Sequence, residues 1–309
     1  MAILVLPTSE FVEHQLVALR AQAPNETICT HPDTAPAGEI EAILAFKLAP
    51  GIAPRFPGLR FVASAGAGVD ELLATQDLPA HVPVVRAVDP LQGQRMAQYV
   101  ALTVLRVHRE LPWLEAQHRD ARWERPAPLP ESACAIGVMG YGANGGPVVD
   151  VLSRLGYPVA VWTRTPHRVE GADTFAGANS LAAFLARSHI LVCALPLTRE
   201  TRGLLGAPAF AALPRGAHVI NVSRGAVMRE PDLLAAIDAG HLSGATLDVF
   251  ETEPLPPDSP LWRHRKILCT PHIAAVPGSE AVAAQFLENL RRARSGEPLQ
   301  NVVDRGRGY

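Results

Sequence analysis

A glycine-rich turn between an expected strand and an expected helix constrains the fold of this chain most. Gly140, Gly142 and Gly145 form a G-x-G-x-x-G pattern directly after an apolar run. An amphipathic helical pattern over 147–155 follows, and a second apolar run covers 158–163. Strand, turn, helix and strand in this order are the context in which such glycines bind the phosphates of a dinucleotide. An ordinary tight turn is the alternative, and this context favours the nucleotide site.

Each glycine of the turn has a predicted role. Gly140 permits the tight turn, Gly142 lets the backbone approach a pyrophosphate, and Gly145 lets the helix pack closely against the strand. Backbone N–H groups at the start of the helix then face the phosphate charge. The predicted cofactor contacts in this turn are Gly140, Tyr141, Gly142, Ala143, Asn144 and Gly145.

Short apolar runs alternate with helical patterns along the whole chain. Most runs are nearly continuous in Val, Ile, Leu and Ala, which is typical of parallel strands buried on both faces. The chain has 309 residues, and domains average roughly 150 residues, so the pattern predicts an α/β protein with two doubly wound domains. The expected strands are 3–7, 42–46, 60–64, 82–88, 135–140, 158–163, 190–196, 217–223, 244–250 and 266–273.

A long helical pattern over 91–120 precedes the glycine-rich turn. Pro112 is expected to kink or divide it, and a proline-rich connection follows at 125–132. We place a crossing between domains near residues 90–100. Further helices are expected over 180–187, over 231–239 and from about 279 onward.

Charge and composition exclude several classes of protein. A formal net charge of −2 gives no reason to expect binding to nucleic acid or to a membrane. The first apolar run is too short for a signal peptide, and no apolar stretch reaches about 18 residues. The four cysteines show neither metal-ligand spacing nor a disulfide framework. We therefore expect a cytoplasmic protein with reduced thiols and no metal site.

The end of the second strand after the glycines bears on the choice of cofactor. An acid roughly 20 residues after the glycines usually holds the ribose hydroxyls, but here Arg164 stands between Thr163 and Thr165. An acid would repel a 2′-phosphate, whereas an arginine binds it bidentately and threonines donate hydroxyls to it. The segment predicts NADP(H), with NAD(H) as the alternative cofactor. A solvated basic turn is the other interpretation.

Three later segments each end an expected strand with a different polar side chain. Arg224, Glu253 and His272 fall where an open α/β sheet binds its ligands, at the carboxyl ends of strands. Reduction of a ketone needs a hydride and a proton, and a histidine is a suitable proton donor near neutral pH. A carboxylate such as Glu253 orients an imidazole and favours its charged form, and Arg224 can hold a substrate carboxylate and polarise the carbonyl. Taken singly, each of the three is also compatible with a structural role.

Several strings together resemble the D-isomer-specific 2-hydroxyacid dehydrogenase family. They are the glycine-rich turn, "LPLTRETRGLL" (195–205), "NVSRGAV" (221–227), "LDVFETEPLP" (247–256) and "TPHIAA" (270–275). Four more look closest to the glyoxylate/hydroxypyruvate reductase A branch: "SAGAGVD" (64–70), "WTRT" (162–165), "SPLWRH" (259–264) and "VDRGRGY" (303–309). One departure is Gln98-Tyr99, at a place where many members carry a Glu-His pair.

The resemblance implies NADPH-dependent reduction of glyoxylate, hydroxypyruvate or a similar short 2-keto acid to the D-2-hydroxy acid. It implies the same three catalytic residues and a homodimer formed through the linking region around Trp113 and Trp123. Ala67 and Gly68 would hold the substrate carboxylate through their N–H groups, together with Arg224 and His272. The remaining cofactor contacts that we expect are Leu195, Pro196, Thr201, Val222, Ser223 and Asp248, the last on the nicotinamide carboxamide.

The expected architecture is a Rossmann dinucleotide-binding domain, residues 99–278, inserted into a discontinuous flavodoxin-like substrate domain. The two parts of the substrate domain are 1–98 and 279–309, and the active site is expected in the cleft between the domains. Two other functions stay open at this point. One is a nucleotide-sensing regulatory protein of the same fold, and the other is a dehydrogenase for a bulkier acid.

Overall fold

The computed structural model describes residues 1–127 and 129–308. Pro128 of the proline-rich connection and Tyr309 at the end of the chain lie outside the described residues. The chain forms two compact units, Met1–Gln92 with Val276–Tyr309 and Gly93–Ala275. Each unit is built on a parallel sheet, so the predicted α/β class is confirmed.

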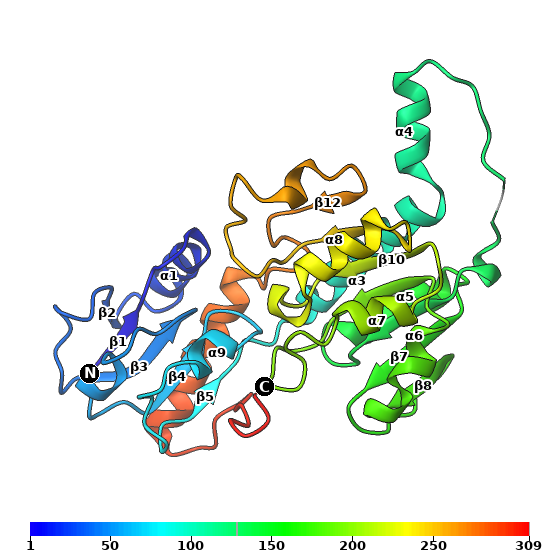
Figure 1. Ribbon diagram of the computed structural model, residues 1–309. Coiled ribbons are helices and arrows are strands. Elements are labelled where there is room, and N and C mark those ends of the chain that lie inside the picture. The colour runs from blue at the N-terminus through cyan, green and yellow to red at the C-terminus, as the bar shows by residue number, and fades with distance from the viewer. Residues whose placement is uncertain (128, 309) are drawn as a thin grey trace. The chain divides into compact units, whose positions relative to one another are not determined.

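The first unit contains a five-stranded parallel sheet with the order β2-β1-β3-β4-β5 (Figure 1). This is the flavodoxin-like strand order, in which β1 and β3 flank the point where the order reverses. The strands are β1 (Ala2–Val5), β2 (Thr27–Cys29), β3 (Ile40–Ala45), β4 (Phe61–Ser64) and β5 (Val84–Val85). The helices are α1 (Glu10–Gln22), α2 (Asp70–Leu73) and α9 (Ser279–Ser295).

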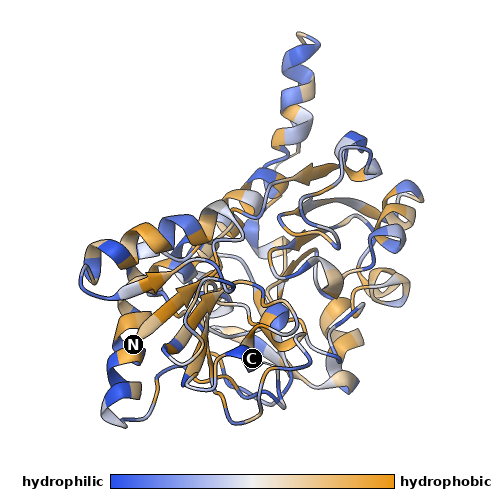
Figure 2. Ribbon diagram, turned by 90° about the vertical axis from the view of Figure 1, so that its left-hand side faces the viewer, coloured by the Kyte–Doolittle hydropathy of each residue, from blue (hydrophilic) through white to orange (hydrophobic). Residues whose placement is uncertain are grey.

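Both faces of this sheet are buried, as the continuous apolar runs predict. Along β1, Ile3 and Val5 pack into a cluster with residues of α1 and α9, whereas Ala2 and Leu4 pack into a second cluster on the opposite face. Figure 2 shows the same pattern, with hydrophobic strands and helices that carry hydrophilic residues on their outer sides. The return segment α9 therefore completes one layer of the first unit.

The second unit contains a seven-stranded parallel sheet with the order β12-β11-β10-β9-β6-β7-β8. Its order reverses between β6 and β9, which is the Rossmann arrangement and places the ligand-binding edge at the ends of these two strands. The strands are β6 (Ile136–Met139), β7 (Val159–Thr163), β8 (Ala172–Ala176), β9 (Ile190–Cys193), β10 (Ala217–Asn221), β11 (Leu242–Leu247) and β12 (Ile267–Cys269).

Helices cover both faces of the second sheet. Residues of α3 and α5 pack on one face, and residues of α6, α7 and α8 pack on the other. Figure 1 shows α4 standing away from the sheet of its own unit. The helices are α3 (Pro90–His108), α4 (Leu111–Arg119), α5 (Gly145–Arg154), α6 (Leu181–Leu185), α7 (Ala207–Ala212) and α8 (Glu230–Asp238).

The long helix expected over 91–120 is divided, as predicted, into α3 and α4. The break lies at Glu110, which has a left-handed backbone with φ of 53°. Pro112 occupies the first turn of α4, where its missing N–H has no helical partner to lose. In the described part of the chain, no helix has the length and apolar character needed to cross a bilayer.

Two strands of the sheets were not predicted, and both lie at sheet edges. β2 and β8 contain exposed or half-buried residues, because an edge strand has only one neighbour and packs less completely. A search for continuous apolar runs passes over β2 and β8, which polar residues interrupt or border, whereas the edge strands β5 and β12 lie within the predicted runs 82–88 and 266–273.

Candidate active site

The glycine-rich turn connects β6 to α5 in a tight conformation. Gly140 has φ of +99° and its N–H donates to the carbonyl of Trp162 at 2.9 Å, which fixes the turn to the end of β7. A Cβ atom on Gly145 would lie 2.1 Å from the carbonyl oxygen of Gly140. Both positions therefore require glycine, one for its backbone conformation and one for close approach.

Gly142 faces open space. A Cβ atom on this residue would have no described atom within 4 Å, in contrast to Gly145. Asn144 is the N-cap residue of α5, whose first N–H groups begin directly after the open side of the turn. Ala143 packs against α3, because a Cβ atom on Gly93 of that helix would lie 2.5 Å from the carbonyl oxygen of Ala143. A rigid turn that is open at Gly142 and ends in a helix N-terminus fits the pyrophosphate of a dinucleotide.

The predicted phosphate-binding residues follow β7 on the surface. Arg164 and Thr165 are exposed, and the hydroxyl of Thr163 donates to the carbonyl of Thr165 at 2.8 Å. The rings of Tyr141 and His167 lie 5.1 Å apart between centroids, so the glycine-rich turn and the Arg164 loop are in contact. The structure thus brings the two predicted parts of the cofactor site together.

The charge of Arg164 also reaches the loop after β9. The pKa of Glu200 is lowered, first by the hydroxyl of Thr198 and further by the charges of Arg164 and Arg199. The charges of Arg164 and the Glu200 carboxylate therefore attract each other. A phosphate bound by Arg164 would compete with this carboxylate for the guanidinium. Sequence analysis did not single out this acid.

The other predicted residues of the loop after β9 are tied into the protein. Leu195 is buried and packs beneath the glycine-rich turn, because a Cβ atom on Gly140 would lie 3.5 Å from Leu195 Cδ2. The hydroxyl of Thr201 donates to the carbonyl of Pro196 at 2.7 Å and accepts from the N–H of Thr198 at 2.8 Å. The Thr201 hydroxyl thus bonds within the loop, and its contact with a cofactor phosphate stays a prediction.

The segment after β10 carries Arg224. Val222 and Ser223 are buried, and the hydroxyl of Ser223 donates to Asn221 Oδ1 at 2.8 Å. Asn221 Nδ2 in turn donates to the carbonyl of Arg224 at 3.2 Å, and the Arg224 side chain is half-buried. The Asn221 side chain also accepts from the N–H of Ser223 at 3.1 Å, so its bonds to Ser223 and Arg224 fix the backbone from which the guanidinium projects.

A glycine contact brings this segment against the segment that carries Glu253. A Cβ atom on Gly225 would lie 1.8 Å from the carbonyl carbon of Phe250, so the two backbones touch. The N–H of Phe250 donates to Glu253 Oε1 at 3.0 Å. Sequence analysis did not predict a role for Gly225. Its position directly after Arg224 was the one indication that this glycine helps to shape the site.

Glu253 and His272 form a hydrogen-bonded pair at the carboxyl edge of the sheet. His272 Nδ1 lies 2.7 Å from Glu253 Oε2, and the side chains are 37% and 35% exposed. Burial raises the pKa of Glu253, but the hydrogen bond and charge of His272 lower it more, with help from the Phe250 N–H and the Arg224 charge. The net pKa is lowered, so Glu253 is a carboxylate at neutral pH. The pair therefore combines a fixed charge with an imidazole that solvent and small molecules can reach.

Asp248 has several hydrogen-bond partners within the protein. It is 1% exposed, and its carboxylate accepts hydrogen bonds from the Thr270 hydroxyl at 2.6 Å and from the N–H groups of Ile273 and Ala274 at 2.8 Å each. These donors come from the loop that carries His272. The carboxylate therefore holds that loop, and its contact with a nicotinamide carboxamide stays a prediction.

The predicted substrate-binding turn lies in the first unit, directly after β4. The hydroxyl of Ser64 donates to the carbonyl of Gly68 at 2.7 Å and accepts from the N–H of Gly66 at 3.2 Å, which closes the turn. Among the described residues, the N–H groups of Ala67 and Gly68 donate to no other backbone group. Two such N–H groups at a turn are suited to an anion. Lys47 of the neighbouring loop pairs with Glu71 at 3.5 Å.

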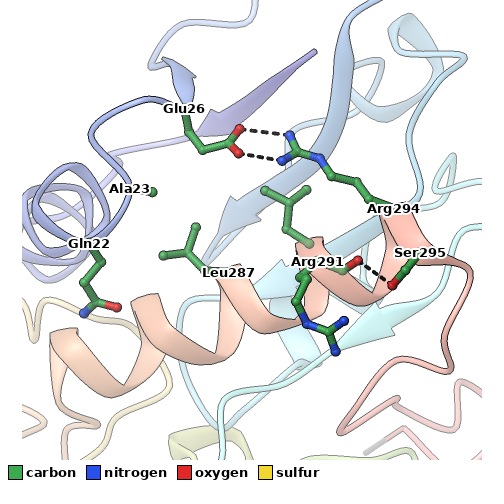
Figure 3. A pocket seen from close by; sticks show the side chains of 8 residues that line it. Gln22, Ala23, Glu26, Leu287, Arg291, Arg294 and Ser295 are labelled. Carbon is green, nitrogen blue, oxygen red and sulfur yellow. Dashed lines mark hydrogen bonds and ion pairs between the residues drawn. The ribbon is translucent and has the colours of Figure 1, made fainter.

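A surface groove of the first unit lies away from the predicted site residues. It runs between the ends of α1 and α9, where Glu26 and Arg294 form a two-pronged ion pair (Figure 3). Arg291 on the same helix is paired with Glu288 and Glu297. The charges around this groove neutralise one another, and no predicted functional residue lines it.

Comparison with known proteins places these features in a family. Residues 101–274 match the family model described as "D-isomer specific 2-hydroxyacid dehydrogenase, NAD binding domain". The chain belongs to this family. Glyoxylate/hydroxypyruvate reductase A from Yersinia enterocolitica is 39% identical over 256 residues, which cover 81% of this chain and 82% of that protein.

Solved structures of relatives cover the whole chain. A D-isomer specific 2-hydroxyacid dehydrogenase from Xanthobacter autotrophicus, solved with NADPH and MES, is 42% identical with a TM-score of 0.93, and the match covers 100% of this chain and 99% of that one. An NADPH-dependent glyoxylate/hydroxypyruvate reductase from Sinorhizobium meliloti, solved with NADP and sulfate, is 34% identical with a TM-score of 0.93 and 100% coverage of both chains. The predicted family and fold are therefore confirmed.

Proposed function

We propose that this protein is an NADPH-dependent reductase that converts a short 2-keto acid, such as glyoxylate or hydroxypyruvate, to the D-2-hydroxy acid. The observation that carries the proposal is the 2.7 Å pair of His272 and Glu253 in the unit that also holds the glycine-rich turn. The names of the relatives from Yersinia and Sinorhizobium support the same reaction.

In this proposal His272 is the proton donor. The Glu253 carboxylate can only accept a hydrogen bond, so Nδ1 of His272 carries a hydrogen toward it at 2.7 Å. Nε2 is then the atom that gives a proton to the carbonyl oxygen of the substrate. NADPH, when bound, supplies the hydride. In the opposite direction the neutral imidazole accepts the proton from the alcohol.

Arg224 is proposed to bind the substrate carboxylate and to polarise the neighbouring carbonyl group. Its planar guanidinium can make two parallel bonds to a carboxylate, and its charge favours the negative charge that develops on the carbonyl oxygen. The N–H groups of Ala67 and Gly68, which donate to no other backbone group among the described residues, are proposed as donors to an anionic group of the substrate. These roles agree with a substrate that has adjacent carboxylate and carbonyl groups.

The proposed cofactor site combines the glycine-rich turn with the loop after β7. The open side at Gly142 receives the pyrophosphate, and Arg164 with the flanking threonines binds the 2′-phosphate. Residues 99–278 are accordingly proposed as the cofactor domain, and residues 1–98 with 279–309 as the substrate domain. NAD(H) is proposed as the weaker cofactor, because it lacks the group that Arg164 would bind.

A panel of short 2-keto acids assayed with NADPH and with NADH tests this function. We expect consumption of NADPH with glyoxylate or hydroxypyruvate, formation of the D-acid, and slower consumption of NADH. Binding of NADPH without turnover of any acid in the panel would contradict the proposal and would favour a nucleotide-sensing protein. Turnover confined to larger acids would leave the chemistry intact and overturn the substrate class.

We also propose that the protein is a homodimer formed through the linking segment. Trp123 is 90% exposed and Trp113 is 36% exposed, and Leu111 and Leu102 add further exposed apolar surface on α4 and α3. Large exposed apolar side chains on a projecting segment are typical of an interface. Sedimentation of the wild type should give a dimer, and Trp113→Glu with Trp123→Glu should give a monomer. A monomeric wild type would contradict the proposal.

A further inference from the structure

The loop that carries His272 has an unusual backbone. His272 is one of the few described non-glycine residues with a positive φ, at 54°, a conformation that is strained for an L-residue. Its N–H donates to the carbonyl of Asp248 at 2.9 Å and to that of Thr270 at 3.0 Å. The direction of the imidazole therefore depends on bonds that hold this loop in place.

Most of those bonds converge on Asp248. The backbone carbonyl of Asp248 accepts from His272, and its buried carboxylate accepts from Thr270, Ile273 and Ala274. A buried carboxylate requires such donors, and bonds to a charged acceptor are stronger than neutral ones. Asp248 thus clamps the loop on both sides of the histidine.

One further side chain reaches this clamp, from a distant part of the second unit. The hydroxyl of Tyr99, on α3, lies 2.6 Å from Thr270 Oγ1 although 171 positions separate the two residues. Thr270 has a single hydroxyl hydrogen, and it points to Asp248 Oδ1 at 2.6 Å because a carboxylate cannot donate. The Tyr99 hydroxyl must therefore be the donor to Thr270. The order of donation is Tyr99 to Thr270 to Asp248.

The tyrosine remains protonated over the working range of the protein. Burial raises the pKa of Tyr99 to about 12, against a smaller opposing effect of its bond to Thr270. The hydroxyl is therefore a permanent donor. It occupies the Gln98-Tyr99 site at which the sequence departs from the Glu-His pair of many family members.

We propose that Tyr99 is a positioning residue for His272. Its hydroxyl donates to Thr270 and so orients the Thr270 hydroxyl toward Asp248. Asp248 in turn holds the loop in the conformation that directs the imidazole toward Glu253. Tyr99 touches neither the imidazole nor Glu253 through any described bond, so it acts through the loop. Its kinetic effect rests on the proposed function, whereas its effect on the loop does not.

Hydrogen exchange of the unliganded protein tests the effect on the loop. Tyr99→Phe keeps the ring and removes only the donor, and we expect the amides of His272, Ile273 and Ala274 to exchange roughly fivefold faster, the effect of one lost hydrogen bond. Tyr157→Phe is the matched control, because Tyr157 is another tyrosine of the second unit, is buried, and has its hydroxyl 2.7 Å from His108 Nδ1. It should leave these three amides unchanged. Unchanged exchange in Tyr99→Phe as well would overturn the proposal.

Kinetics test the consequence for His272. In Tyr99→Phe we expect kcat with glyoxylate to fall roughly fivefold with little change in the KM for NADPH, because the imidazole and not the cofactor site is disturbed. A rise in the KM for NADPH as large as the loss in kcat would contradict positioning of the imidazole. Thr270→Val removes the middle donor and should act in the same direction if Tyr99→Phe does not fold. A wild type without turnover would refute the proposed function, and the exchange experiment would still decide the role of Tyr99.

Discussion

His272 Nδ1 lies 2.7 Å from Glu253 Oε2, a contact between two residues 19 positions apart at neighbouring strand ends. The contact fixes which nitrogen of the imidazole faces the protein and leaves the other for a substrate. It also places a lasting negative charge beside the ring, since the pKa of Glu253 is lowered overall despite the opposing effect of its burial.

Glu253→Gln should shift the pH dependence of reduction. The lowered pKa keeps Glu253 charged at neutral pH, where its carboxylate accepts from His272 Nδ1 and so directs Nε2 toward the substrate. The wild type should lose activity as the pH falls through the lowered pKa of Glu253, the variant should lack this limb, and the rate of the variant at neutral pH should be on the order of 10²-fold lower. Glu251→Gln, which changes an exposed carboxylate of the same loop, is the control. Identical pH profiles for wild type and Glu253→Gln would refute the electrostatic role.

Arg164→Ala should reduce the preference for NADPH. Loss of a charge-assisted bond to the 2′-phosphate should raise the KM for NADPH by roughly 10- to 100-fold, while the KM for NADH should change little. Arg154→Ala, at another exposed arginine of the second unit, controls for overall charge. An equal preference for NADPH in wild type and Arg164→Ala would show that the phosphate binds elsewhere.

Gly142→Ala and Gly145→Ala should separate binding from folding. A Cβ atom at Gly142 meets no described atom within 4 Å, whereas one at Gly145 meets a carbonyl oxygen at 2.1 Å. Gly142→Ala should keep the melting temperature and weaken NADPH binding about tenfold or more, equivalent to about 1.4 kcal/mol. Gly145→Ala should destabilise the second unit by roughly 1–3 kcal/mol. Calorimetry with and without NADPH measures both effects, and full NADPH affinity in Gly142→Ala would contradict the assigned pyrophosphate position.

Glu26→Gln should make the first unit less stable near neutral pH. The hydrogen bond and charge of Arg294 lower the pKa of Glu26 from its usual 4.5. The ion pair therefore stabilises the folded state fully above pH 4.5, and this contribution is lost as the pH falls through the lowered pKa. The pair is about three-quarters buried, with side chains 28% and 24% exposed, and we expect a loss of about 1 kcal/mol. Denaturant unfolding at pH 7 and pH 3 measures it, with Glu13→Gln of α1 as the control. A stability difference that persists unchanged at pH 3 would exclude the ion pair as its cause.

The sequence was sufficient for the features that depend on local patterns. Continuous apolar runs identified the inner strands of both sheets, and the order of strand, glycines and helix identified the turn at Gly140. Glu253 and His272 were expected to meet because the carboxyl ends of parallel strands lie at one edge. The edge strands β2 and β8 were missed because polar residues interrupt or border their short apolar runs.

Contacts between distant side chains could not be predicted in the same way. Nothing in the local pattern around Tyr99 indicates that its hydroxyl reaches Thr270, because that contact depends on how α3 packs against the sheet. The partners of Asp248 were also unexpected, since its position at a strand end is compatible with a ligand as well as with a clamp. Both contacts arise from tertiary packing, and only the three-dimensional arrangement reveals them.

Single-turnover oxidation of bound NADPH by glyoxylate, in wild type and in His272→Gln, tests the central claim most directly. The account predicts that both proteins bind NADPH equally, and that the variant, which lacks a proton donor, reacts on the order of 10²–10⁴-fold more slowly. An equal rate in the two proteins would contradict the role assigned to the His272–Glu253 pair.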